Sequence, residues 1–195
     1  MTPTRLNALT DGVVAIVLTI MVLELKIPAE PTVEAVLDVL PLLAAYLLAF
    51  VNVAIYWNNH HHMVQSAHRV TGGVLWANHA LLFWLTLFPL MIRWIDEAGI
   101  TPLPVASFGV VLIGASASYL VLERTLIRAE GEESRVKSAV GGGFKEWISF
   151  ALYAGAVPAA FISPLISVAI YVAVSVIWLV PDRRFERQII GKAGE

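Results

Sequence analysis

The chain has 195 residues, of which 58% are hydrophobic and only 14% are charged, and its formal net charge is −2. Soluble domains carry about 25% charged residues, so this composition excludes a soluble globule, and it excludes a disordered chain, which needs low hydrophobicity. The absence of cysteine excludes disulfides, cysteine-ligated metals and thiol nucleophiles, and the small net charge predicts no nucleic acid as partner. We therefore expect an integral membrane protein surrounded by the lipid bilayer.

Six apolar stretches approach or reach the roughly 20 residues that a helix needs to cross a bilayer. In chain order they are Leu9–Leu25, Val36–Trp57, Val74–Trp94, Val105–Leu122, Trp147–Ile162 and Leu165–Val180. The stretches are uniformly apolar rather than alternating, which predicts helices and not a β-barrel. Pro164 separates the last two, because the residue before a proline disfavours helix. The predicted fold is one all-α membrane domain, residues 1–195, with six transmembrane helices, and Asp11 at the start of the first argues against a cleaved signal peptide.

Basic residues indicate how these helices are oriented. If the spans alternate, eleven of the thirteen Lys and Arg residues lie on the side of the N-terminus, and only Lys26 and Arg93 lie on the other. The excess predicts that both termini are cytoplasmic, together with the longest loop, at about 128–145, and a short basic tail at 181–195. The outer side carries Glu24, Glu30, Glu34, Asp38, Asp96 and Glu97. This acidic surface either concentrates cations or simply reflects the exclusion of basic residues.

Polar residues at the start of the first span are candidates for function, because such groups are costly inside a membrane. The segment contains Arg5, Thr10 and Asp11. One interpretation pairs Arg5 and Asp11 with other polar groups inside the bundle. The other makes Thr10 and Asp11 ordinary helix-start residues.

A histidine run closes the second span, where Trp57 is followed by Asn58, Asn59 and His60–His62. Adjacent helical residues point about 100° apart, so three consecutive histidines do not face one ion, and we predict no metal site. The run is either an ordinary membrane-boundary segment or part of a network with Arg5 and Asp11.

The third span carries Asn78, whose amide can bridge helices, and Pro89, which predicts a kink. The sequence has no GxSxG motif, no HExxH motif and no phosphate-binding glycine loop. We therefore predict that the protein is not an enzyme and has no cofactor.

These residues resemble the signatures of the prokaryotic relatives of the lysosomal potassium channel, the transmembrane protein 175 family. The run from Arg5 through Leu9-Thr10-Asp11-Gly12 is similar to the family's RxxxFSDG motif, with Leu9 in place of Phe and Thr10 in place of Ser. The run from Trp57 to His61 resembles its WxxHH motif, and Asn78 and Pro89 match its third helix. The resemblance covers the first three helices, whereas the last three match in number and hydropathy.

The resemblance implies a potassium-permeable cation channel of the prokaryotic cell membrane, with potassium as the permeating ion. It also implies a homotetramer in which four copies of the first helix line a central pore. Carried over by position, Ile16, Ile20 and Leu23 form the apolar constriction, and Thr19 contributes to selectivity. The implied structural network comprises Arg5, Thr10, Asp11, Trp57, His60, His61 and Asn78.

Helix geometry is consistent with this assignment. At 100° per residue, Ile16, Thr19, Ile20 and Leu23 share an arc of about 100°, and Asp11 points away from it. Any apolar helix offers a similar stripe, which can face lipid or the protein core. The helix geometry alone therefore does not establish that these residues line a pore. A secondary transporter and another polytopic membrane protein, such as an enzyme or scaffold, stay open as alternatives. A transporter predicts broken helices near the membrane midplane, whereas the Gly and Pro breaks here fall mostly at helix ends.

Overall fold

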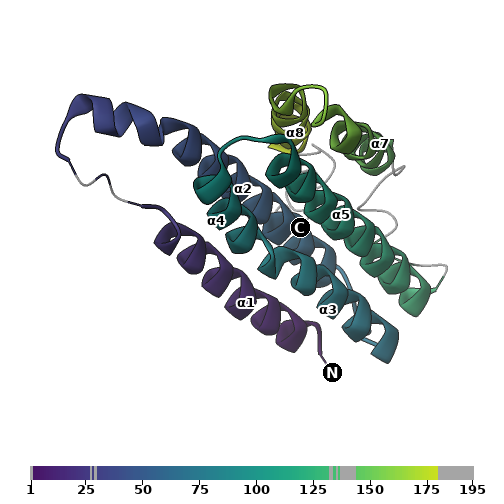
Figure 1. The fold of residues 1–195 in the computed structure, drawn as a ribbon. Coiled ribbons are helices and arrows are strands. Elements are labelled where there is room, and N and C mark those ends of the chain that lie inside the picture. The colour runs from purple at the N-terminus through teal and green to yellow at the C-terminus, as the bar shows by residue number, and fades with distance from the viewer. Residues whose placement is uncertain are drawn as a thin grey trace, which may run out of the picture.

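The computed structural model describes residues 2–26, 28, 30–131, 134, 136 and 144–179, and these residues form an all-helical bundle (Figure 1). The helices in chain order are α1 (Pro3–Leu23), α2 (Val33–Gln65), α3 (Gly72–Thr86), α4 (Phe88–Ala98), α5 (Pro102–Glu130), α7 (Phe144–Ala159) and α8 (Pro164–Leu179). The predicted tail at 181–195 and most of the loop predicted at about 128–145 lie outside the described residues.

Helices α3 and α4 together form the predicted third span, interrupted at Leu87. Pro89 occupies the first turn of α4, where its missing N–H costs nothing. The other expected spans are each matched by one helix, and α2 and α5 extend beyond the apolar stretches at both ends. For example, α2 begins at Val33 and continues to Gln65, because polar residues at a membrane boundary can remain helical.

Among the residues that the structure describes, four helical units are long and apolar enough to cross a membrane: Pro3–Leu23, Val33–Gln65, Gly72–Ala98 and Pro102–Glu130. The helix α8 is apolar but shorter over its described residues. These findings confirm the predicted all-helical, multi-pass membrane protein.

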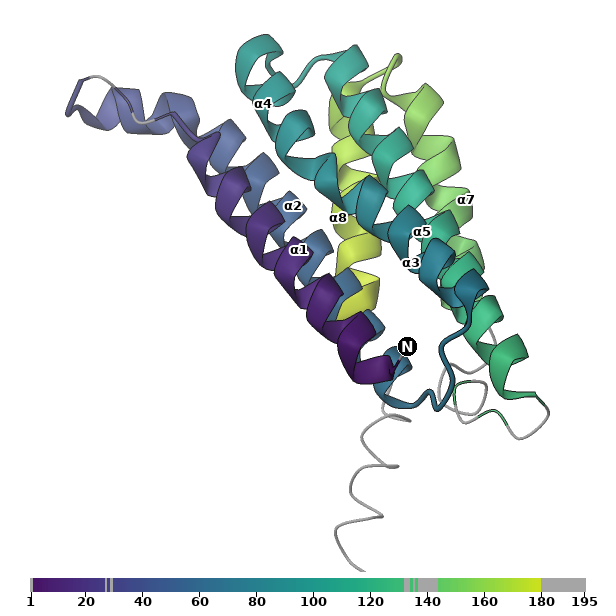
Figure 2. The ribbon, with the colours of Figure 1, turned by 90° about the horizontal axis from the view of Figure 1, so that it is seen from below.

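The N-terminus lies at the same end of the bundle as the link between α2 and α3 (Figure 2). We call this the N-terminal end. There the backbone N–H of His68 donates to the Glu130 carboxylate at 2.7 Å, which ties the α2–α3 link to the end of α5. At the opposite end, Lys26 forms a 2.6 Å salt bridge with Asp96. The Asp96 carboxylate raises the pKa of Lys26, which favours the protonated form of the lysine.

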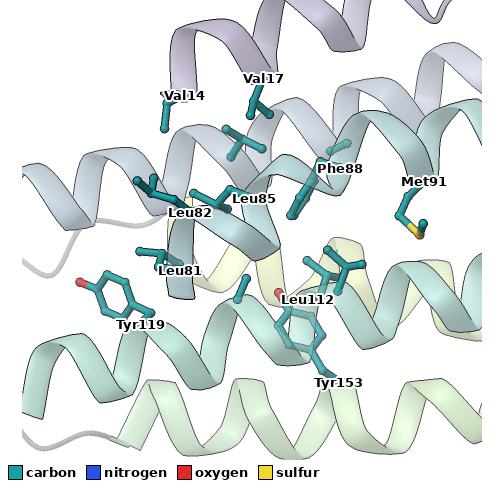
Figure 3. Packing of buried hydrophobic residues seen from close by; sticks show 14 of the residues in the cluster. Val14, Val17, Leu81, Leu82, Leu85, Phe88, Met91, Leu112, Tyr119 and Tyr153 are labelled. Carbon is teal, nitrogen blue, oxygen red and sulfur yellow. The ribbon is translucent and has the colours of Figure 1, made fainter. Parts of the chain in front are cut away.

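The helix α5 is the centre of the packing and contacts α3, α4, α7 and α8. Its approach to α3 is close at Gly114, where an added Cβ atom would lie 2.2 Å from the Trp84 ring. In contrast, α1 lies along one edge of the bundle beside α2 (Figure 2). The core that joins these layers is apolar, and Figure 3 shows Leu81 of α3 and Leu112 of α5 within it.

Candidate functional site

One stripe of α1 is buried within the subunit. The helix contacts α2, α3 and α4, and the residues that it buries recur every three or four positions, as expected for one helix face. They are Leu6, Thr10, Val14, Val17 and Met21. Figure 3 shows Val14 and Val17 of α1 on the side that faces Leu82 and Leu85. The stripe therefore fixes which side of α1 points away from the subunit.

The four residues predicted to line a pore lie on that other side. Ile16 is 58% exposed, Ile20 41% and Leu23 80%, and Thr19 is also exposed. We call these four residues the exposed face of α1. Large apolar side chains exposed in a row need a partner, which for this face is either lipid or another protein surface.

The hydroxyl of Thr19 is bonded to its own helix. It lies 2.9 Å from both the Ala15 and the Ile16 carbonyl oxygens, to which it donates. Its single proton is therefore directed back to the backbone. The lone pairs of the hydroxyl oxygen remain available to accept a hydrogen bond or contact a cation.

A polar cluster lies behind the exposed face and joins three helices. Thr10 of α1, His60 of α2 and Asn78 of α3 are 1%, 1% and 0% exposed. The His60 Nε2–H donates to the Asn78 Oδ1 at 2.7 Å, a direction required because an amide oxygen only accepts. The Asn78 amide N–H in turn donates to the Thr10 hydroxyl at 3.2 Å. Each helix thus contributes one buried polar group, and each group has a partner.

A second contact reaches α1 from the same region of α2. The indole N–H of Trp57 donates to the Asp11 carboxylate at 2.7 Å, and the His61 ring lies 5.7 Å from the Trp57 ring. Asp11 itself remains exposed in the single subunit. Within the described part of the chain, no hydrogen bond or salt bridge to the Arg5 side chain is found. The structure therefore brings together six of the seven residues of the predicted network and leaves out Arg5.

Another polar cluster, farther from α1, was not anticipated from the sequence. The Asn52 amide donates to the Ser175 hydroxyl at 3.0 Å, and the Tyr153 hydroxyl donates to the Asn52 Oδ1 at 3.5 Å. These contacts join α2, α7 and α8. In the sequence, the sign of this cluster was Asn52, a polar residue inside an otherwise apolar predicted span. Nothing in the sequence identified the residues that it contacts.

The described residues contain no group of three or more His, Cys, Asp or Glu side chains arranged to hold a metal ion. His60 is engaged by Asn78 rather than by the neighbouring histidines. The arrangement around the exposed face is therefore one of apolar side chains and a hydroxyl, held from behind by hydrogen bonds.

Comparison with known proteins places this architecture among ion channels. A family model described as the endosomal/lysosomal potassium channel TMEM175 matches residues 5–89, the segment that contains most of α1, the polar cluster and Pro89. A curated potassium channel of Chryseobacterium sp. (strain P1-3) is 44% identical over 97% of this chain and 98% of its own length.

Two further likenesses come from Chamaesiphon minutus. A potassium channel of Chamaesiphon minutus is 31% identical over 58% of this chain and 52% of its own length. The crystal structure of a lysosomal potassium-selective channel TMEM175 homolog from Chamaesiphon minutus superposes with a TM-score of 0.78. That match covers 91% of this chain and 96% of the solved chain at 24% identity, so it shows the shared fold.

Proposed function

Since the chain belongs to the TMEM175 family of potassium channels, we propose that it is a potassium-permeable channel whose pore is lined by the exposed face of α1. The observation that carries this assignment is the face itself. Ile16 and Leu23 are 58% and 80% exposed, while the opposite side of α1 is fixed by buried contacts. A single α1 does not enclose a path, so the pore is formed by four subunits with their α1 helices at the axis.

The constriction of this pore is apolar. Rings of Ile16, Ile20 and Leu23 present no oxygen atoms to replace the water around an ion. Such rings restrict conduction by width and by dewetting. We expect modest conductance, and selectivity weaker than that of a filter built from backbone carbonyls.

Thr19 supplies the oxygen atoms that the apolar rings lack. Its hydroxyl donates to the backbone of α1 at 2.9 Å, which favours an orientation in which the oxygen lone pairs remain free to accept. In a tetramer, four such oxygens form a layer between the Ile16 and Leu23 rings. This layer partly replaces the hydration shell of a potassium ion and is the source of selectivity.

The polar cluster has a structural role in this proposal. Thr10, His60 and Asn78 fix the rotation of α1 against α2 and α3, so the exposed face points to the axis. Asp11 and Trp57 add a second attachment one residue along the helix. The N-terminal end of the bundle faces the cytoplasm, as the basic residues predict.

Potassium flux into liposomes that contain the purified protein tests this function. A voltage-driven current that rises without saturation as potassium increases supports a channel. A flux that saturates and requires a coupled ion identifies a secondary transporter. A flux no greater than that of empty liposomes, at verified incorporation, would contradict the proposal.

A further inference from the structure

Two buried polar atoms, one on α1 and one on α2, have no hydrogen-bond partner within the described residues. They are the Asn7 Oδ1 atom and the His61 Nδ1 atom, and they lie on helices that contact each other. A buried polar atom without a partner destabilises the folded chain, so each one calls for an explanation.

The register between α1 and α2 places these two residues at the same level. The helices run in opposite directions, since the N-terminus and the α2–α3 link lie at the same end (Figure 2). The Trp57 indole donates to the Asp11 carboxylate, which fixes one level of the register. Asn7 lies four residues before Asp11, and His61 lies four residues after Trp57. Each is therefore about one helical turn from that contact, on the same face of its helix and toward the same end.

The chemistry of the two atoms decides what can join them. The Asn7 Oδ1 atom only accepts hydrogen bonds. The His61 Nδ1 atom accepts when it carries no proton and donates when it carries one. Two facing acceptors repel each other, so a proton on Nδ1 converts an unfavourable pair into a hydrogen bond between α1 and α2.

A positively charged His61 has attractive neighbours. Its ring lies 5.7 Å from the Trp57 ring, at an interplanar angle of 31°, and a cation beside an indole is attracted by the ring. Trp57 also holds the Asp11 carboxylate at 2.7 Å, and among the described residues no salt bridge to that carboxylate is found. A proton on His61 therefore brings a positive charge close to a carboxylate that lacks one.

Other charged or titratable side chains of α1, α2 and α3 surround this region, and they are Arg5, Asp11, His60, His62 and His79. The His62 ring lies 5.7 Å from the His61 ring, so a charge on His62 opposes one on His61. His60 and His79 are each bonded through a ring nitrogen to a neutral oxygen, and Arg5 is exposed. The charged residues of α4 lie at the opposite end of the bundle, and α8 carries none. Asp11 is therefore the negative charge that favours a proton on His61.

We propose that His61 is a proton-binding site that attaches α1 to α2. Its Nδ1 atom takes a proton from the water at the N-terminal end, and the resulting N–H donates to the Asn7 Oδ1 atom. The attachment lies one turn beyond the contact between Asp11 and Trp57, so it holds the first turns of α1. The site itself does not depend on the proposed channel function, whereas any effect on conduction does.

Thermal unfolding of the purified protein in detergent, from about pH 5.5 to about pH 8, tests the proposal. A proton held more tightly in the folded state stabilises that state below about pH 6.5, where a free imidazole is protonated, and the gain is lost as the pH rises. His61→Gln keeps a donor for Asn7 but cannot titrate. The melting temperature of the wild type relative to this variant should be higher in acid than in base by about 2–4 °C.

Variants of Asn7 identify the acceptor. Asn7→Leu removes the oxygen and should lose the same pH-dependent gain. Asn7→Asp places a carboxylate opposite His61 and should extend the gain to higher pH, which keeps the test informative if Asn7→Leu fails to fold. Asn58→Leu and His79→Gln, both at exposed positions, are the matched controls and should leave the pH dependence unchanged.

Three results would overturn the assignment. If His61→Gln shows the same pH dependence as the wild type, His61 does not bind the proton. If His61→Gln and Asn7→Leu lower the melting temperature equally at all pH values, a water molecule or a neutral hydrogen bond joins the two residues. If the pH profile of Asn7→Asp coincides with that of the wild type, Asn7 is not the acceptor. None of these results depends on potassium flux, so the proposed channel function is tested separately.

Discussion

The helices α1 and α5 are both long and apolar, yet they are used differently. In α5, 61% of the most apolar window is buried inside the subunit, and in α1 only 28% is. Hydropathy is nearly the same for the two, at 2.0 and 2.1, so composition does not explain the difference. The buried fractions differ because of where the two helices lie. The helix α5 packs on four neighbouring helices, whereas α1 lies at an edge of the bundle and buries one stripe.

This difference separates two roles for an apolar helix. The helix α5 holds the subunit together, and substitutions on it should act on folding. The helix α1 has one side that serves the subunit and one that the subunit leaves uncovered. Substitutions on α1 should therefore act on folding or on conduction according to the side on which they fall.

The largest loss of stability is expected from a substitution at the contact between α5 and α3. Gly114→Val places a Cβ atom about where the Trp84 ring lies, since even a single added carbon would sit 2.2 Å from it. The overpacking should destabilise the protein by about 3 kcal/mol or more, seen as a lower melting temperature and a loss of monodisperse protein. Gly155→Ala is the matched control, because nothing lies within 4 Å of its added Cβ atom. Equal stability of the two variants would show that α5 is not packed as described.

A smaller loss is expected from the buried side of α1 and its neighbours. Asn78→Leu removes the nearer acceptor of the His60 Nε2–H and leaves it only the Thr10 hydroxyl oxygen at 3.4 Å, so it should cost about 2 kcal/mol in the free energy of unfolding. The double variant His60→Leu, Asn78→Leu removes both partners and should recover part of that loss. Simple addition of the two single losses would mean that the side chains are not coupled.

How far the sequence predicts this region depends on the residue. Polar residues inside apolar spans can be recognised individually from the sequence. Thr10, His60 and Asn78 were identified in this way. Their pairing over as many as 68 positions depends on how three helices rotate against each other, which the sequence does not state. Arg5, assigned to the same network by its motif, is exposed, because a motif identifies a position without giving its contacts.

The acidic residues near the N-terminal end show a different limit. Hydropathy ended the fourth span at Leu122 and began the fifth at Trp147, so Glu123 and Glu146 fell just outside the predicted spans. In the structure both helices continue past these limits, and both carboxylates are buried. Hydropathy detects the apolar part of a helix, whereas burial depends on which neighbours cover its ends.

The attachment between Asp11 and Trp57 should contribute less than the buried cluster, because Asp11 is exposed. Asp11→Asn keeps the shape but weakens the 2.7 Å hydrogen bond from the Trp57 indole, and we expect a loss of about 1 kcal/mol. The measurement is the melting temperature together with the proportion of assembled protein in mild detergent. Because Trp57→Phe removes the donor from the same bond, it should give a similar loss, and a much larger loss for Asp11→Asn would indicate a further partner in the assembly.

The smallest effect is expected on the exposed face of α1. Thr19→Val removes the hydroxyl oxygen while nearly preserving side-chain volume, and it leaves the buried stripe untouched. We expect unchanged stability and a loss of potassium-over-sodium preference of up to about fivefold, which corresponds to about 1 kcal/mol. Reversal potentials in mixed potassium and sodium solutions measure it. An unchanged preference would remove Thr19 from the ion path.

Flux through Ile16→Asn tests most directly whether the exposed face of α1 lines the pore. Amide groups in the proposed Ile16 ring lower the cost of wetting it, so cation flux per incorporated protein should rise and discrimination between potassium and sodium should fall. Val14→Asn, on the buried stripe at 4% exposure, is the matched control and should reduce stability without raising flux. Equal flux for wild type and Ile16→Asn, at equal incorporation, would place Ile16 outside the pore and contradict the account.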